Sequence, residues 1–263
     1  MKKYITICIT VFLLFPSFSS AQTWDQFSDD FNGSLDLGID LTKSMFSSKN
    51  IPYYLGGAAL IAGSMFLIDE PLRDYSQDHQ NAFKSGLFGI DKYYGDIKYT
   101  PAAVLALYTV GLFSKNQSVR EAGLRASQAM VYTGIITVIT KEIFGRSRPY
   151  SGDGSTSFHP FTFQEDHRSF FSGHTSLVFS ISTVFAAEID NIFWKIGWYG
   201  LAVLVGGARI YHDKHWFSDV ITGAVVGYAI GRFVVNNSDK YINTVGADTQ
   251  GGAYQINFNF YLN

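Results

Sequence analysis

The chain has 263 residues, enough for one large domain or two small ones, and 47% of them are hydrophobic while 16% are charged. This composition excludes an intrinsically disordered chain and a collagen-like chain. The formal net charge of −2 provides no basic surface for binding nucleic acid, so we predict no nucleic-acid partner.

The first 21 residues have the three parts of a secretory signal peptide. Two lysines precede an apolar run over residues 4–15, and small residues over 17–21 supply a cleavage site. We therefore predict that residues 1–21 are removed, and that the protein is exported, being periplasmic or membrane-associated on the extracytoplasmic side. The single cysteine, Cys8, lies inside this run, so the mature chain would hold no disulfide. An uncleaved anchor is the alternative, although the run is short for a membrane span.

A polar lead-in over residues 22–50, irregular or helical, precedes six apolar segments rich in Ala, Gly, Leu, Val and Ile. These segments cover residues 52–68, 99–113, 126–144, 172–190, 194–211 and 217–235. Their lengths are typical of helices rather than strands. The sequence therefore predicts an all-α protein with a six-helix core bundle in a helical domain over residues 51–237.

The last segment, residues 238–263, has a different periodicity. Apolar and polar side chains alternate from Tyr254 to Leu262, after a Gly-rich turn, which is typical of a β-strand. Residues 241–245 are a candidate hairpin partner. We expect a short β segment at the C-terminus.

The spacing of charged residues indicates whether the predicted helices cross a membrane, because a span needs about 20 apolar residues and a charge inside the bilayer is costly. Only the charge-free windows 50–68 and 169–187 approach that length. We therefore expect a bundle that is soluble or peripheral outside the cytoplasmic membrane. Spanning stays open as the alternative, because Lys195 and Arg232 would be able to extend their charges to the interface.

Three short motifs stand at the ends of predicted helices. The first runs from Lys141 to Pro149 at the end of the third core helix, the second is Ser172-Gly173-His174 at the start of the fourth, and the third runs from Arg209 to Asp219 between the fifth and sixth. In an up-and-down bundle these helix ends lie on the same side. We therefore expect the three motifs to converge on one site.

The cationic members of these motifs are typical of a phosphate site. Lys141, Arg148 and Arg209 together match a multiply charged anion, because a guanidinium fork pairs with two phosphate oxygens and a lysine adds a mobile charge. Ser172 and Gly173 add a hydroxyl and backbone N–H groups at the positive end of a helix dipole.

Two histidines have the positions that phosphoryl chemistry requires. His215 is followed four residues later by Asp219, so the carboxylate would accept from one ring nitrogen and leave the other directed at phosphorus. This arrangement predicts that His215 is the nucleophile. His174 would then protonate the departing oxygen, and water would hydrolyse the phosphohistidine. This chemistry needs no cofactor and no metal.

The motifs Lys-x6-Arg-Pro, Ser-Gly-His and Arg-x5-His-x3-Asp resemble the three-part signature of the type 2 phosphatidic acid phosphatase superfamily, which includes bacterial acid phosphatases and vanadium haloperoxidases. The resemblance implies a helical-bundle phosphatase fold. It also implies that phosphate is held by Lys141, Arg148, Ser172, Gly173 and Arg209, and that His174, His215 and Asp219 are catalytic. Phe171 and Ala208 stand where the family usually has Pro and Ser, which bears on loop shape and substrate preference.

The expected substrate is a phosphate monoester or diphosphate, and we favour one linked to a lipid, of the phosphatidic acid or isoprenoid diphosphate class. We expect vanadate to inhibit the reaction. A non-specific soluble acid phosphatase of the periplasm is the first alternative. A vanadium haloperoxidase, in which His215 would ligate vanadate, and a catalytically silent anion-binding bundle are the others.

Several of these residues also have plain structural interpretations. Ser172 and Ser218 are candidate N-caps, and Glu142 and Arg146 are expected to form a solvated helical pair. His212 and His215 suggest a zinc site, but the motif uses His215 otherwise. His159 and His167 lie with several phenylalanines in the loop 145–171, where we expect either a lid over the site or ordinary loop packing.

Overall fold

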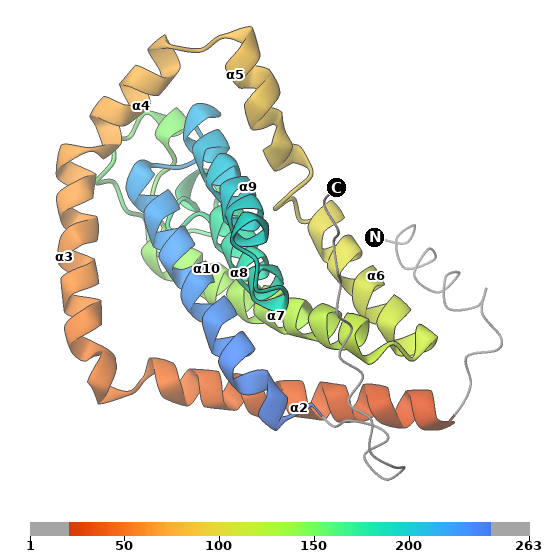
Figure 1. The fold of residues 1–263 in the computed structure, drawn as a ribbon. Helices are drawn as coiled ribbons and strands as arrows, with labels where there is room; N and C mark the ends of the chain where they lie inside the picture. Colours follow the sequence, from red (N-terminus) through yellow and green to blue (C-terminus); the bar gives the residue numbers. More distant parts are fainter. Residues whose placement is uncertain (1–20, 243–263) are drawn as a thin grey trace.

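A computed structural model describes residues 21–242 (Figure 1). Residues 1–20 of the predicted signal peptide lie outside this range. The alternating segment after residue 242 also lies outside it, so the predicted C-terminal strand stays a prediction.

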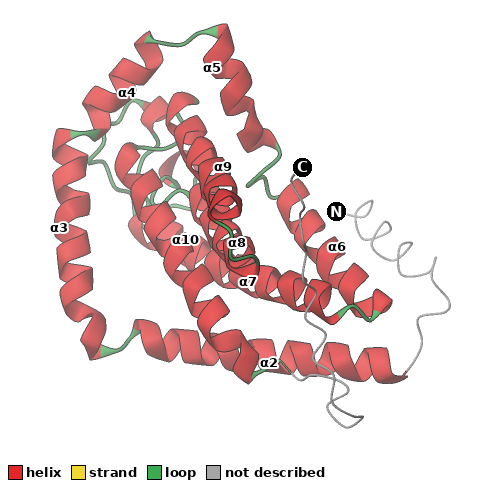
Figure 2. Cartoon of the chain, viewed as in Figure 1, coloured by secondary structure: helices red, strands yellow, loops and turns green. Residues whose placement is uncertain are grey.

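The described residues form helices and loops, as the sequence predicts (Figure 2). The helices are α2 (Ala21–Met45), α3 (Ile51–Leu67), α4 (Asp69–Asp78), α5 (Ala82–Leu87), α6 (Tyr99–Ser114), α7 (Gln117–Phe144), α8 (Gly173–Glu188), α9 (Ile192–Tyr211) and α10 (Phe217–Asn237). The six apolar segments correspond to α3 and α6 to α10. Most of the lead-in is helix α2. Helices α4 and α5 were not expected, because α4 is polar and α5 has only six residues.

Helix α8 is the centre of the core and packs against α7, α9 and α10. Its side chains Val178, Ile181 and Val184 are fully or almost fully buried. Helix α10 approaches α8 closely, because an added Cβ at Gly227 would lie only 2.1 Å from the carbonyl oxygen of Ser176. Small residues on α10 thus allow the two backbones to meet.

Helices α2 to α5 run around this core as a frame (Figure 1). Helix α2 is fastened to α6 and α7 by the buried Asp30, which accepts hydrogen bonds from Tyr108 at 2.9 Å and from Arg120 at 2.5 Å. Helix α3 lies further out, and its apolar side chains are exposed, as Leu60 is at 78%. The frame therefore presents apolar surface outwards.

One helix of the described range, Phe217–Lys240, is long and apolar enough to cross a membrane, and the bent pair Ser48–Leu67 and Asp69–Asp78 would add a second span. The helix Phe217–Lys240 contains Asp219 and Arg232, which the counting of charge-free windows treated as interruptions, whereas the predicted window 50–68 covers most of the first helix of the bent pair. The window 169–187, by contrast, is mostly the buried helix α8. Charge spacing therefore identified one of the two candidates and missed Phe217–Lys240, because it takes any charge as the end of a window and cannot tell a buried core helix from an exposed one.

Candidate active site

The three motifs meet at one end of the core. The backbone N–H of Ser172, before α8, donates to the carbonyl of Asp219 in α10 at 3.0 Å. The ammonium of Lys141, near the end of α7, donates to the carbonyls of Arg168 and Ser169, the latter at 3.3 Å. The structure thus brings the motifs together as the bundle topology predicted.

His215 is buried, and the cations that the sequence singled out lie close enough for their charges to act on it. Its pKa is lowered well below the ordinary value, first by burial and then by the positive charges of Lys141, Arg148 and Arg209. His215 is therefore neutral at pH 7, which is the state that a nucleophile needs.

Asp219 reaches His215 less directly than the sequence predicted. The distance from Oδ2 of Asp219 to Nδ1 of His215 is 3.7 Å, too long for a hydrogen bond. Ser169 lies between them: its hydroxyl donates to Asp219 Oδ2 at 2.5 Å and lies 3.5 Å from His215 Nδ1. The same carboxylate oxygen accepts the backbone N–H of Trp216 at 3.0 Å, as a capping carboxylate does. Sequence reasoning missed Ser169, which belongs to none of the three motifs.

The predicted solvated pair of Glu142 and Arg146 is wrong. Helix α7 ends at Phe144, and its C-cap Gly145 has a left-handed φ of +58°, so Arg146 is no longer on the helix surface. Arg146 is fully buried and bridges two buried carboxylates, Asp69 at 2.7 Å and Asp219 at 2.6 Å. Glu142 pairs with Arg168 at 2.8 Å instead. Arg146 therefore holds Oδ1 of the catalytic candidate Asp219, while Oδ2 faces Ser169 and His215.

The three predicted phosphate-binding cations differ in their partners. Arg148 pairs with the exposed carboxylate of Glu165, and Arg209 donates to the buried Asp91 at 2.8 Å. The Nε of Arg209 is buried without a hydrogen-bond partner within the described part of the chain. The pKa of Lys141 is lowered to about 7, first by burial and then by Arg148. This cluster of crowded cations would gain from an anion.

The start of α8 supplies the remaining predicted residues. Ser172 is the N-cap, its hydroxyl accepting the backbone N–H of Thr175 at 3.4 Å. At Gly173 an added Cβ would lie 3.1 Å from Thr137, so the missing side chain lets α8 begin close to α7. Burial, with help from Arg209, lowers the pKa of His174 to about 4.

The other structural interpretations can also be compared with the structure. His212 lies 3.2 Å from Asp91, and neither His212 nor His215 belongs to a group of metal-ligating side chains within residues 21–242. Ser218 is not an N-cap, because Trp216 holds that position and the Ser218 hydroxyl donates to Asp69 at 2.6 Å.

Residues 122–242 match the family model described as PAP2 superfamily. The similarity to the PAP2 superfamily thus covers somewhat less than half of the chain. One curated relative is a "Lipid A 1-phosphatase" of Porphyromonas gingivalis, which is 29% identical over 49% of this chain and 27% of the relative. Another is "Lipid phosphate phosphatase 2" of Arabidopsis thaliana, which is 29% identical over 51% of this chain and 56% of the relative. The chain thus matches less than two thirds of the length of these relatives.

Two solved structures have the same all-α PAP2 fold. The first is LpxE of Aquifex aeolicus, with a TM-score of 0.50 and 22% identity, covering 64% of this chain and 95% of the other. The second is described as a transmembrane PAP2 type phosphatidylglycerolphosphate phosphatase from Bacillus subtilis, with a TM-score of 0.57 and 19% identity, covering 74% of this chain and 98% of the other. At these identities the likeness concerns the fold.

Proposed function

We propose that the protein is a phosphoric ester hydrolase that removes phosphate from a lipid-linked monoester or diphosphate through a phosphohistidine on His215. The observation that carries this proposal is the neutral, buried His215 beside three cations, one of which, Arg209, has a buried donor without a partner among residues 21–242. An anion-binding protein would need the cations but not a neutral nucleophile among them. The names of the curated PAP2 relatives support the same reaction class.

In the proposed reaction Lys141, Arg148 and Arg209 hold the phosphoryl oxygens together with the N-terminus of α8. Because Nδ1 of His215 faces Ser169 and Asp219, the other nitrogen, Nε2, forms the bond to phosphorus while the bond to the leaving oxygen breaks. His174 donates its proton to that oxygen. Water then attacks the phosphohistidine, giving its proton to His174 and releasing inorganic phosphate. The negative charge of the bound substrate would raise the pKa of His174 and so favour the protonated acid.

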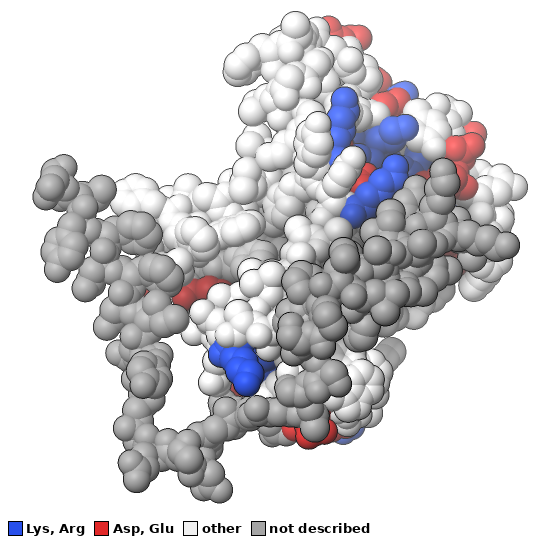
Figure 3. Space-filling model, turned by 90° about the vertical axis from the view of Figure 1, so that its right-hand side faces the viewer, with Lys and Arg blue, Asp and Glu red and all other residues white. Residues whose placement is uncertain are grey.

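Exposed apolar side chains next to the site favour a lipid substrate over a small soluble ester. Ile143 and Phe144 end α7 just beyond Lys141, and Phe161 and Phe163 in the following loop are 64% and 71% exposed. Figure 3 shows most of the charged side chains of the face drawn gathered at its upper right, with smaller charged patches elsewhere and uncharged described residues between them. Such surface would contact acyl or isoprenoid chains, and we infer that the protein acts in association with a membrane on its extracytoplasmic side.

An activity panel tests the substrate class. It compares a lipid monophosphate, an isoprenoid diphosphate and a soluble aryl phosphate, each with and without vanadate. We expect release of phosphate from one of the lipids, inhibition by vanadate, and an acid-labile, base-stable phosphate on the chain after a rapid quench. Preference for the aryl phosphate would favour the soluble acid phosphatase, and halide oxidation with vanadate and peroxide would favour the haloperoxidase. An unphosphorylated chain during turnover would contradict the phosphohistidine.

Membrane association is tested separately by fractionation. A carbonate wash releases peripheral proteins and leaves integral ones in the pellet. Recovery in the soluble fraction before the wash would contradict association.

A further inference from the structure

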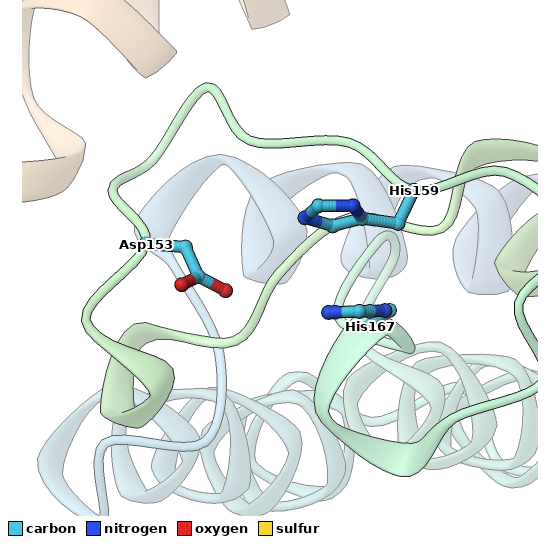
Figure 4. Close-up of side chains that lie close together, drawn as sticks. All are labelled: Asp153, His159 and His167. Carbon is cyan, nitrogen blue, oxygen red and sulfur yellow. The ribbon is translucent and has the colours of Figure 1, made fainter.

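Three side chains with metal-ligating groups gather in the loop between α7 and α8, outside the residues assigned to the reaction. They are Asp153, His159 and His167, and one ligand atom from each lies within 4.8 Å of those of the other two. The two imidazole rings are stacked with centroids 4.0 Å apart. Figure 4 shows the carboxylate of Asp153 facing the edges of both rings. Two imidazoles and one carboxylate are a donor set that suits zinc and related divalent transition metals.

The backbone holds both histidines against the end of α7. The N–H of His159 donates to the carbonyl of Gly145 at 2.7 Å, and the N–H of Arg148 donates to the carbonyl of Asp166, next to His167, at 2.8 Å. Any Cβ at Gly145 would lie 1.9 Å from the carbonyl oxygen of His159, so this contact depends on glycine. The two histidines, eight positions apart in the sequence, are therefore fixed as neighbours.

Hydroxyl groups hold the three candidate ligands. Ser147 donates to Oδ2 of Asp153 at 2.9 Å, Ser157 lies 3.0 Å from Nε2 of His159, and the hydroxyl of Thr162 lies 3.1 Å from Nδ1 of His167. Outer contacts of this kind orient metal ligands and tune their basicity.

We propose that Asp153, His159 and His167 bind one divalent cation of the zinc class, which clamps the loop between the first two motifs. Bonds to zinc of about 2.0–2.2 Å place tetrahedral ligands about 3.4 Å apart, so the ligand atoms have to close by roughly 1 Å, a shift that partly exposed side chains make by rotation. Through Ser147 the clamp is tied to the segment that carries Arg146 and Arg148. The cation thus has a structural role, away from His215, and the proposal does not depend on the reaction proposed above.

Zinc binding by the full chain tests this site. The protein is prepared without any added histidine tag and stripped of metal with a chelator. Zinc is then titrated by calorimetry, and thermal unfolding is followed in parallel. We expect one zinc per chain and a higher melting temperature with zinc. His167→Ala and Asp153→Asn should each weaken binding at least ten-fold and remove the thermal shift, whereas His79→Ala, which changes an exposed histidine outside the cluster, should change neither.

Two outcomes would overturn the site. One is that the wild type does not bind zinc at a defined stoichiometry. The other is that zinc binding and the thermal shift persist in both Asp153→Asn and His167→Ala. If His167→Ala fails to fold, Asp153→Asn decides, because Asp153 is exposed. The titration is repeated on His215→Ala, so that loss of the proposed activity and loss of the metal site are read out independently.

Discussion

Replacing Arg146 by methionine should destabilise the protein strongly. The guanidinium is fully buried between Asp69 and Asp219, whose side chains are also fully buried. Methionine fills a similar volume but leaves both carboxylates without their cation. Removing one partner of a buried ion pair costs about 3–5 kcal/mol, because the charge that remains is neither solvated nor compensated.

For a chain of this size a loss of 1 kcal/mol lowers the melting temperature by about 2–4 °C, so we expect Arg146→Met to melt about 6–20 °C below the wild type. Thermal unfolding followed by circular dichroism measures the shift. A matched control is Lys43→Met, since the pair of Lys43 and Asp40 is exposed and such pairs contribute about 0–1 kcal/mol.

A double variant tests whether buried charge is the cause. Adding Asp69→Asn to Arg146→Met removes one of the two uncompensated carboxylates, so the double variant should lose less stability than the two single variants add up to. A melting temperature of Arg146→Met within about 2 °C of the wild type would refute this prediction. It would mean that the guanidinium of Arg146 does not compensate the charges of two buried carboxylates.

Three further predictions concern the reaction and its pH dependence. His215→Ala should keep the melting temperature and lose turnover by about four orders of magnitude or more, as cooperating catalytic groups do, and a His79→Ala control should keep both. The pKa of His174 is about 4 in the folded protein and 6.5 for an ordinary histidine, so on acidification the unfolded chain binds a proton at this residue before the folded chain does. The melting temperature should therefore fall as the pH falls from about 6.5 to 4. An equally large fall in His174→Asn would contradict this assignment. Because the pKa of Lys141 is about 7, its ammonium loses its positive charge as the pH rises above 7, while sulfate stays a dianion. Inhibition by sulfate should therefore weaken above about pH 7. A Lys141→Met variant with the same pH dependence of inhibition would argue against Lys141 as an anion ligand.

The sequence allowed most of the core helices, and the convergence of the three motifs at one end of them, to be predicted. The apolar segments predicted α3 and α6 to α10, because a helix of this length needs an apolar face that is visible in the residue order. The convergence of the motifs followed from the alternation of helix direction in a bundle. Helices α4 and α5 gave no such signal, because α4 is largely polar and α5 is too short to show a period.

The sequence could not assign the residues that support the site from a distance. Arg146 was predicted to be solvated because spacing of four suggests a pair on one helix, but the left-handed Gly145 ends the helix before it. Ser169 and Asp69 belong to no motif, and each acts through a neighbour brought in by the fold. Asp91 likewise holds Arg209 across 118 positions of sequence.

The residue order by itself determined the lengths of the helices and the functional groups at their ends. These groups are three cations, two histidines and a carboxylate. Those properties are local, since they depend on side-chain type and on spacing within a turn or two of helix. The tertiary structure alone decided the burial that makes His215 neutral and Lys141 weakly basic, and the contacts of Arg146, Ser169 and the loop histidines. Burial and long-range contacts depend on which distant segments pack together, and that information is not contained in the spacing of any one motif.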